Sequence, residues 1–231
     1  MSDYQGLEEL ILMEEAVNYN MWITSLCKPY IKGDLLEIGS GIGSFTSKWF
    51  EIADSIVALE IAANCIKIFK ERYGSENRIT VIEKDITDLS EDLIERYDTV
   101  VSINVFEHIE NDFKAFSNVF KVLKPQGNFI CFVPAFQKLY GKTDRAVGHY
   151  RRYNREELLE KLNRAGFLIK EVRYINIIGY FAWSLTGNKK TVLSRKNIIF
   201  YDRFIIPFLK QIESVIKVPV GQSLLVIASK T

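Results

Sequence analysis

Residues 35–46 read Leu-Leu-Glu-Ile-Gly-Ser-Gly-Ile-Gly-Ser-Phe-Thr. The apolar residues at the start of this stretch predict a buried strand, and the three glycines allow a tight turn and a close approach of the backbone to a ligand. We expect a helix to begin near Ser44. An acid, Glu60, follows about 20 residues after the first glycine, as in strand–turn–helix units that bind nucleosides.

The glycine spacing differs from two common phosphate-binding patterns. Glu37 begins a Glu-x-Gly-x-Gly-x-Gly pattern. A dinucleotide-binding turn would need its third glycine at Ser44 or Thr46, and a P-loop would end in Gly-Lys-Ser/Thr. A carboxylate at the strand end would also repel pyrophosphate and attract an ammonium or sulfonium cation. The pattern therefore favours a cationic nucleoside over NAD or a nucleoside triphosphate.

Polar residues also follow three later strand signals. Glu60 ends the apolar run 55–60, Asp85 follows 79–84, and Asn104 follows 97–103. Taken singly, Glu60 is a solvated strand-end acid and Asp85 a turn residue or helix cap. Taken in order, they would lie together at the carboxyl edge of a parallel sheet, where open α/β folds bind ligands.

These motifs together resemble those of the class I S-adenosylmethionine-dependent methyltransferases, over most of residues 30–135. The resemblance implies that the glycine turn holds the methionine part of the cofactor and that Glu60 takes the ribose hydroxyls. It sets Asp85 against the adenine and places 104–108 along the methyl-transfer site. The implied cofactor-binding residues are Glu37, Gly39, Gly41, Gly43, Glu60, Ile61, Asp85, Ile86, Asn104 and Val105.

The order of the remaining signals predicts an α/β fold. Strands are expected near 34–38, 55–60, 78–83, 97–103, 126–134, 167–174 and 223–229, and helices near 44–51, 62–73, 110–124 and 155–165, the last capped by Asn154. Alternation of this kind predicts a Rossmann-like, doubly wound, mostly parallel seven-stranded sheet with helices on both faces. In the resembled family the last strand is antiparallel.

The chain of 231 residues is expected to form a single methyltransferase domain. We divide it into an N-terminal helical lid (1–31), a cofactor-binding core (32–135), an active-site loop (136–153) and a helical substrate-cap insertion before the last strand (175–218). The three cysteines show no paired spacing, so neither disulfides nor a zinc site is expected. No metal is expected, because no Asp/Asn cluster near Asp144 is evident.

Composition and charge bear on location and partners. The N-terminal region is acidic and the chain has no run of about 18 apolar residues, so we expect a cytoplasmic protein that is neither exported nor membrane-spanning. A net charge of +1 argues against general nucleic-acid binding. Residues 186–217 nevertheless carry seven basic side chains against two acidic ones. This insertion is either a pair of helices packed on the sheet or a surface for an anionic, peripheral membrane contact.

The chain has only two histidines, His108 and His149, and both are expected in loops at the carboxyl edge of the sheet. Either can act as the base that deprotonates a methyl acceptor, with His108 alternatively a packing residue beside the cofactor. The run 148–153 resembles one in a bacterial and archaeal methyltransferase subgroup associated with polysaccharide and lipid-linked glycan assembly. The candidate substrate-binding residues are Tyr150, Arg151, Arg152 and Tyr153.

We therefore expect O-methylation of a sugar, a lipid-linked glycan or another small molecule. A non-catalytic S-adenosylmethionine-binding module, or N- or C-methylation of a small metabolite, remains open. The segment after the fourth strand, Asn104-Val-Phe-Glu, has no Pro-Pro pair, which disfavours methylation of nucleic-acid amino groups. The glycine spacing disfavours a nicotinamide dehydrogenase.

Overall fold

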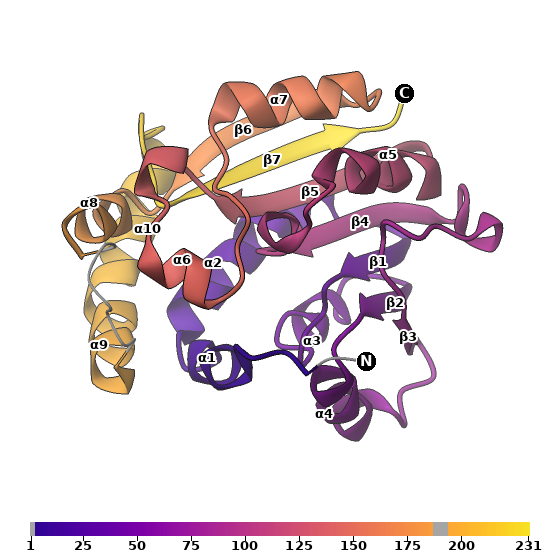
Figure 1. Cartoon of the computed structure of the whole chain (residues 1–231), viewed down its shortest axis with the longest axis horizontal. Coiled ribbons are helices and arrows are strands. Elements are labelled where there is room, and N and C mark those ends of the chain that lie inside the picture. The colour runs from indigo at the N-terminus through magenta and orange to yellow at the C-terminus, as the bar shows by residue number, and fades with distance from the viewer. Residues whose placement is uncertain (1–2, 187–193) are drawn as a thin grey trace.

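A seven-stranded sheet runs through the computed structural model, which describes residues 3–186 and 194–231 (Figure 1). Its strand order is β3-β2-β1-β4-β5-β7-β6. The strands are β1 Asp34–Ile38, β2 Ser55–Glu60, β3 Ile79–Glu83, β4 Tyr97–Ile103, β5 Leu123–Pro134, β6 Leu168–Ile175 and β7 Ser223–Ser229. β7 lies antiparallel between β5 and β6, and the pairs among β1 to β5 are parallel. The predicted fold class, including the antiparallel last strand, is confirmed.

Helices cover both faces of the sheet. They are α1 Leu7–Met13, α2 Val17–Cys27, α3 Thr46–Trp49, α4 Ala63–Tyr73, α5 Asp112–Val122, α6 Lys142–Ala146, α7 Arg155–Arg164, α8 Ile177–Thr186, α9 Arg195–Phe200 and α10 Ile206–Val215. Short turns of 3-10 helix occur at η1 Lys28–Tyr30, η2 Glu91–Leu93, η3 Phe106–His108 and η4 Gln137–Leu139, and a π-helical turn, η5 Tyr201–Ile205, joins α9 to α10.

Two apolar layers hold the helices to the sheet. On one face Phe116 of α5 and Leu158 of α7 pack on the sheet. On the other, Trp22 of α2, Trp49 of α3 and Leu209 of α10 do so. Figure 1 shows α5 and α7 on one side and α2 and α3 on the other. Burial of both faces explains why consecutive apolar residues of the central strands are buried, as Leu35 and Leu36 are in β1 and Val100 and Val101 in β4.

Three local predictions were wrong in detail. The helix expected at 44–51 is only the single turn α3. The strand expected at 126–134 begins earlier, because β5 starts at Leu123 and accommodates Gln126 at a φ of 63°. Asn154 stands at the start of α7 but its side chain accepts a hydrogen bond from the N–H of Gln137 instead of capping the helix.

The carboxyl edge of the sheet gathers the segments of interest. β1 lies between β2 and β4, so the chain leaves β1 toward one side and β4 toward the other. The loops after these strands therefore diverge at a topological switch point, the usual ligand crevice of an open α/β sheet. The segment 137–153 follows β5 at the same edge, and helices α1 and α8 lie beyond it.

Candidate active site at the carboxyl edge

Gly39 allows the loops after β1 and β4 to touch. It has a φ of 66°, and a Cβ atom added there would stand 2.5 Å from a methyl group of Val105. Any larger residue would combine backbone strain with a steric clash. Gly41 has a φ of 54° and faces Leu10 of α1. The glycine turn is thus shaped by close contacts with two neighbouring segments.

Glu37 is buried, and its carboxylate is held within the protein. Thr46 Oγ1 donates to one oxygen at 2.6 Å and Trp49 Nε1 to the other at 3.1 Å. Burial raises the pKa of Glu37 to about 7. Glu37 therefore ties α3 to β1 and fixes the turn between them, and its expected role toward a cationic ligand stays a prediction.

Glu60 lies beside the glycine turn and organises its backbone. One carboxylate oxygen accepts from the N–H of Gly41 at 2.8 Å, and the other from Ile61 and Ala62 at 2.7 and 2.9 Å. An ionised carboxylate has about four lone-pair positions, so it can accept one more donor. This geometry fits a ribose hydroxyl.

The other predicted cofactor-binding residues lie at the same carboxyl edge of the sheet. Ile61 is 57% exposed beside Glu60, so its apolar side chain is accessible to a ligand. Asp85 is exposed and accepts from the N–H of Thr87 at 2.7 Å, while Ile86 is buried behind it. Asn104 is exposed at a φ of 54°. An acid, two isoleucines and an amide along adjacent strand ends fit a nucleoside.

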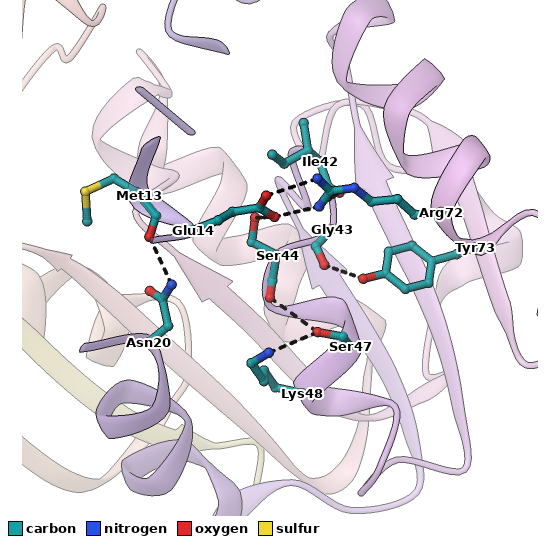
Figure 2. Close-up of polar contacts among 10 residues, drawn as sticks. All are labelled: Met13, Glu14, Asn20, Ile42, Gly43, Ser44, Ser47, Lys48, Arg72 and Tyr73. Atoms are coloured by element: carbon teal, nitrogen blue, oxygen red, sulfur yellow. Dashed lines mark hydrogen bonds and ion pairs between the residues drawn. The ribbon is translucent and has the colours of Figure 1, made fainter. Parts of the chain in front are cut away.

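The N-terminal segment covers the glycine turn. Tyr4 and Leu10 pack against Ile42 of that turn. Glu14, at the end of α1, forms a two-pronged ion pair with Arg72 of α4 and accepts from Ser44 Oγ at 2.7 Å (Figure 2). A cleft of about 170 Å³ lies beside this ion pair. The lid predicted for 1–31 has a defined anchor on the cofactor-binding core.

The two histidines meet beyond β4 and β5. Their ring centroids are 4.6 Å apart at an interplanar angle of 90°. His149 Nδ1 lies 3.0 Å from a carboxylate oxygen of Asp144, and His149 Nε2 lies 3.9 Å from Glu107. Both histidines thus lie in loops at the carboxyl edge, as the sequence predicted. Glu107 and Asp144, which lie beside them, were not predicted as site residues. Their proximity in sequence, one residue before His108 and five before His149, was the available signal.

The charges around these rings have defined causes. Burial would raise the pKa of Asp144, but its hydrogen bond with His149 and the Arg152 guanidinium outweigh burial and lower it. Burial raises the pKa of Glu107 to about 7, and burial together with the charge of His149 lowers the pKa of His108 to about 4. Asp144 is therefore ionised and His108 neutral at neutral pH.

The predicted substrate residues separate into two groups. Tyr150 is 53% exposed and free to meet a ligand. Tyr153 is fully buried and donates to the Phe106 carbonyl and to Asp112, so its expected stacking on a sugar is corrected. Arg151 pairs with Asp112 at 2.8 Å, and Arg152 Nε donates to Asp144 at 2.8 Å. Both arginines are thus engaged within the protein, because buried acids lie next to them.

The insertion between β6 and β7 contacts the active-site loop through aromatic side chains of α8, among them Tyr180, whose ring centroid lies 5.2 Å from that of Phe136. The Arg152 guanidinium lies 4.5 Å from the ring centroid of Trp183 in α8, and Trp183 Nε1 donates to the Leu139 carbonyl. Asp202 of the π-helical turn accepts from the backbone N–H groups of Asn18 and Tyr19 and caps α2. The insertion therefore links the active-site loop to the N-terminal helices.

Comparisons with known proteins agree with this geometry. Residues 36–131 match the model of a family described as "Methyltransferase domain". The ribosomal RNA small subunit methyltransferase A of Syntrophus aciditrophicus is 31% identical over 135 residues, 53% of this chain and 48% of that protein. Nodulation protein S of Azorhizobium caulinodans is 28% identical over 62% of this chain and 66% of that protein. The chain spans about half the length of the first of these relatives.

A solved structure extends the likeness to almost the whole chain. The N-methyltransferase NodS of Bradyrhizobium japonicum, crystallised with S-adenosylhomocysteine, superposes with a TM-score of 0.63 over 98% of this chain and 97% of that one, at 17% identity. At that identity the likeness concerns the fold. With the family match, it supports a class I S-adenosylmethionine-dependent methyltransferase and S-adenosylmethionine as the cofactor.

Proposed function

We propose that this chain transfers the methyl group of S-adenosylmethionine to an oxygen of a small or lipid-linked acceptor, with a saccharide as the first candidate. The observation that carries the proposal is the hydrogen bond between Asp144 and His149 Nδ1 at the mouth of the cofactor edge. It fixes the imidazole with Nε2 directed away from Asp144, toward Glu107.

The residues divide the work between binding and proton transfer. Glu60, Ile61 and Asp85 would hold the nucleoside, and the turn at Gly41 the methionine end. S-adenosylmethionine, when bound, supplies a methyl sulfonium, an electrophile that needs only an aligned nucleophile; alignment is worth roughly 7 to 11 kcal/mol. His149 Nε2 would take the proton of the acceptor hydroxyl, the acceptor oxygen would receive the methyl group that S-adenosylmethionine supplies, and S-adenosylhomocysteine would be the leaving group. A positioned base adds about 10² to 10⁴ in rate.

Arg152 has a supporting part in this scheme. Its guanidinium pairs with Asp144 and lies against Trp183, so it keeps Asp144 ionised and fixed in place. Ionised Asp144 accepts from His149 Nδ1 in the neutral tautomer that serves as base, so that Nε2 is the nitrogen directed toward the acceptor. In this protein the arginine therefore positions the base, and substrate recognition falls to Tyr150 and the insertion.

The test is S-adenosylhomocysteine release against pools of sugars, lipid-linked glycans and small phenols, comparing His149→Ala with His108→Ala. With the acceptor found, His149→Ala should lower kcat by about 10² or more with S-adenosylhomocysteine affinity nearly unchanged, since the cofactor residues lie on other loops. If His108→Ala abolishes turnover while His149→Ala keeps its rate, the base is misassigned.

We further propose that the insertion brings the enzyme to an anionic membrane surface that carries its acceptor. Phe200, Phe204 and Phe208 recur every fourth residue along α9, η5 and α10, each about 60% exposed. Exposed basic residues recur every seventh residue through the same segment, at Lys196, Arg203, Lys210 and Lys217. An apolar stripe flanked by a basic one is the pattern of interfacial helices. Among the described residues no helix is long and apolar enough to cross a membrane.

A nitrogen acceptor is the second candidate, favoured by the likeness in fold to NodS, which is an N-methyltransferase. An amine with a free lone pair would need no base, so neither histidine substitution would abolish its methylation. The ribosomal RNA relative raises nucleic acid as a substrate class, but the net charge of +1 and the absence of a Pro-Pro pair after Asn104 favour a small acceptor.

A further inference from the structure

We propose that Glu107, His108 and His149 form a binding site for a first-row divalent transition-metal ion such as Zn²⁺ or Mn²⁺. One ligand atom from each of the three side chains lies within 4.8 Å of the other two. Two imidazoles and one carboxylate with an open fourth position make up a donor set that catalytic zinc sites use. No metal was expected from the sequence, where no Asp/Asn cluster near Asp144 is evident and His108 and His149 stand 41 positions apart.

Both histidines already have the hydrogen-bond partners that orient metal-binding imidazoles. His149 Nδ1 bonds Asp144, and His108 bonds the backbone of Gly148, which faces its Nδ1 atom. Metal-binding histidines usually donate their second ring N–H to a carboxylate or a carbonyl. This arrangement leaves both Nε2 atoms free to coordinate.

Glu107 supplies an independent reason to expect a ligand. The side chain is completely buried, and within the described residues neither carboxylate oxygen has a hydrogen-bond partner. A buried carboxylate without donors costs several kcal/mol unless it is paired or coordinates a metal. The three donor atoms would need to approach by about 1 Å, because ligands of a tetrahedral ion at about 2.1 Å stand about 3.4 Å apart.

Metal binding would change the part played by His149. A lone pair that coordinates an ion cannot accept a proton, so the base proposed above belongs to the metal-free protein. In the metal-loaded protein the ion itself would lower the pKa of a bound acceptor hydroxyl. The site stands on its own geometry, and it can be tested without cofactor, acceptor or turnover.

The test uses the whole chain, stripped with a chelator and titrated with Zn²⁺ by calorimetry and with Co²⁺ by visible absorption. We expect one ion per chain, with affinity at least tenfold weaker in Glu107→Gln, His108→Ala and His149→Ala. Asp144→Asn should weaken binding by about 10- to 100-fold, because it removes the carboxylate that orients the His149 ring. The matched control is Glu110→Gln, an exposed acid three residues after Glu107, which should bind as the wild type does.

A second measurement needs no variant. Because the chain has only two histidines, its ¹⁵N imidazole spectrum contains two residues, and Zn²⁺ should shift the Nε2 signals of both. S-adenosylhomocysteine binding of each variant reports whether it folds. Zn²⁺ binding that leaves both imidazole spectra unchanged, or that is equal in all variants, or that is absent in the wild type would overturn the site. None of these results bears on methyl transfer itself.

Discussion

Buried carboxylates define this molecule at the scale of single residues. Glu37 and Glu107 lie inside the protein at the ends of β1 and β4, and burial raises the pKa of each to about 7. Glu37 accepts two hydrogen bonds that partly offset the cost of its burial, whereas Glu107 accepts none in the described residues. Their different surroundings point to different roles, structural for Glu37 and ligand-binding for Glu107.

The raised pKa of Glu37 predicts a pH-dependent stability. Below about pH 4.5 its carboxyl is protonated in both the folded and the unfolded state. Between about 4.5 and 7 the unfolded state loses the proton first, so the free energy of unfolding falls as pH rises, by about 3 kcal/mol for this group. Urea unfolding between pH 5 and 8 should show a smaller fall for Glu37→Gln than for the wild type.

Two variants make this measurement specific. Glu83→Gln removes an exposed strand-end acid and should keep the wild-type pH dependence. Glu107→Gln, measured in chelator, should remove a fall similar to that of Glu37. An identical pH dependence in Glu37→Gln and the wild type would mean that Glu37 is ionised inside the folded protein.

Single residues were predicted best where backbone geometry alone dictates them. The glycine turn, the acid at Glu60 and the two histidines lie where the sequence indicated. The directions of Glu37, Arg152 and Tyr153 were not predictable, because each depends on partners brought close by folding, namely Trp49, Trp183 and Asp112. Sequence spacing reveals residue chemistry but not which side of a loop turns inward.

At the scale of elements, the N-terminal helix α1 acts as a cover held by few contacts. Its last turn is fastened by the ion pair of Glu14 with Arg72, which is partly exposed (Figure 2). Tyr4 lies edge-on against His108, with ring centroids 6.1 Å apart, so the cover reaches both the cofactor edge and the histidines. We predict that a cofactor entering this edge requires the cover to open.

Loosening the cover should speed its opening. Glu14→Gln removes the charge that pairs with Arg72, a loss of about 1 kcal/mol for a partly exposed ion pair. We expect about fivefold faster limited proteolysis within residues 3–16 and faster dissociation of S-adenosylhomocysteine in stopped-flow measurements. Glu8→Gln, an exposed acid on the same helix, is the control. Equal proteolysis of Glu14→Gln and wild type would show that the apolar contacts of Tyr4 and Leu10 alone hold the cover.

The helices of the insertion carry the proposed membrane contact. Replacing Phe200, Phe204 and Phe208 with serine should reduce co-sedimentation with anionic vesicles, because the phenylalanines supply the buried apolar area. Binding should also weaken as salt rises and the Debye length falls to about 8 Å. Phe181→Ser, an exposed phenylalanine of α8, serves as the control. Equal partition of the wild type onto neutral and anionic vesicles, or none onto either, would leave the insertion as packing helices. Lys189 and Lys190, two of the seven basic residues in 186–217, lie outside the described residues.

At the scale of the whole molecule, the sheet is the most predictable part. Its strands are short apolar runs bounded by turn residues, and their alternation with helices leaves little freedom in strand order once crossovers are right-handed. The helical character of the insertion was predicted, but its packing was not, because the insertion lies outside the strand–helix alternation and packs through scattered contacts such as Asp202 on α2. The cluster of Glu107, His108 and His149 could not be foreseen, since two separate loops must converge to form it.

The central claim is that the carboxyl edge between β1, β2 and β4 binds S-adenosylmethionine through the glycine turn and Glu60. The proposed roles of His149 as base and of α1 as a cover both presuppose this site, whereas the metal site does not. Glu60 supports the turn through Gly41 and keeps one lone-pair position for a ribose hydroxyl. Substitution of Glu60 therefore tests directly whether this edge of the sheet binds the cofactor.

The most direct measurement is calorimetric titration of the wild type, Glu60→Ala and Glu83→Ala with S-adenosylhomocysteine and with NAD. The wild type should bind S-adenosylhomocysteine and not NAD. Glu60→Ala should lose about 1 to 3 kcal/mol of affinity, the cost of unmet hydroxyl partners in a partly buried site, and Glu83→Ala, at the end of the neighbouring strand, should lose none. Tighter binding of NAD, or full S-adenosylhomocysteine affinity in Glu60→Ala, would contradict the account.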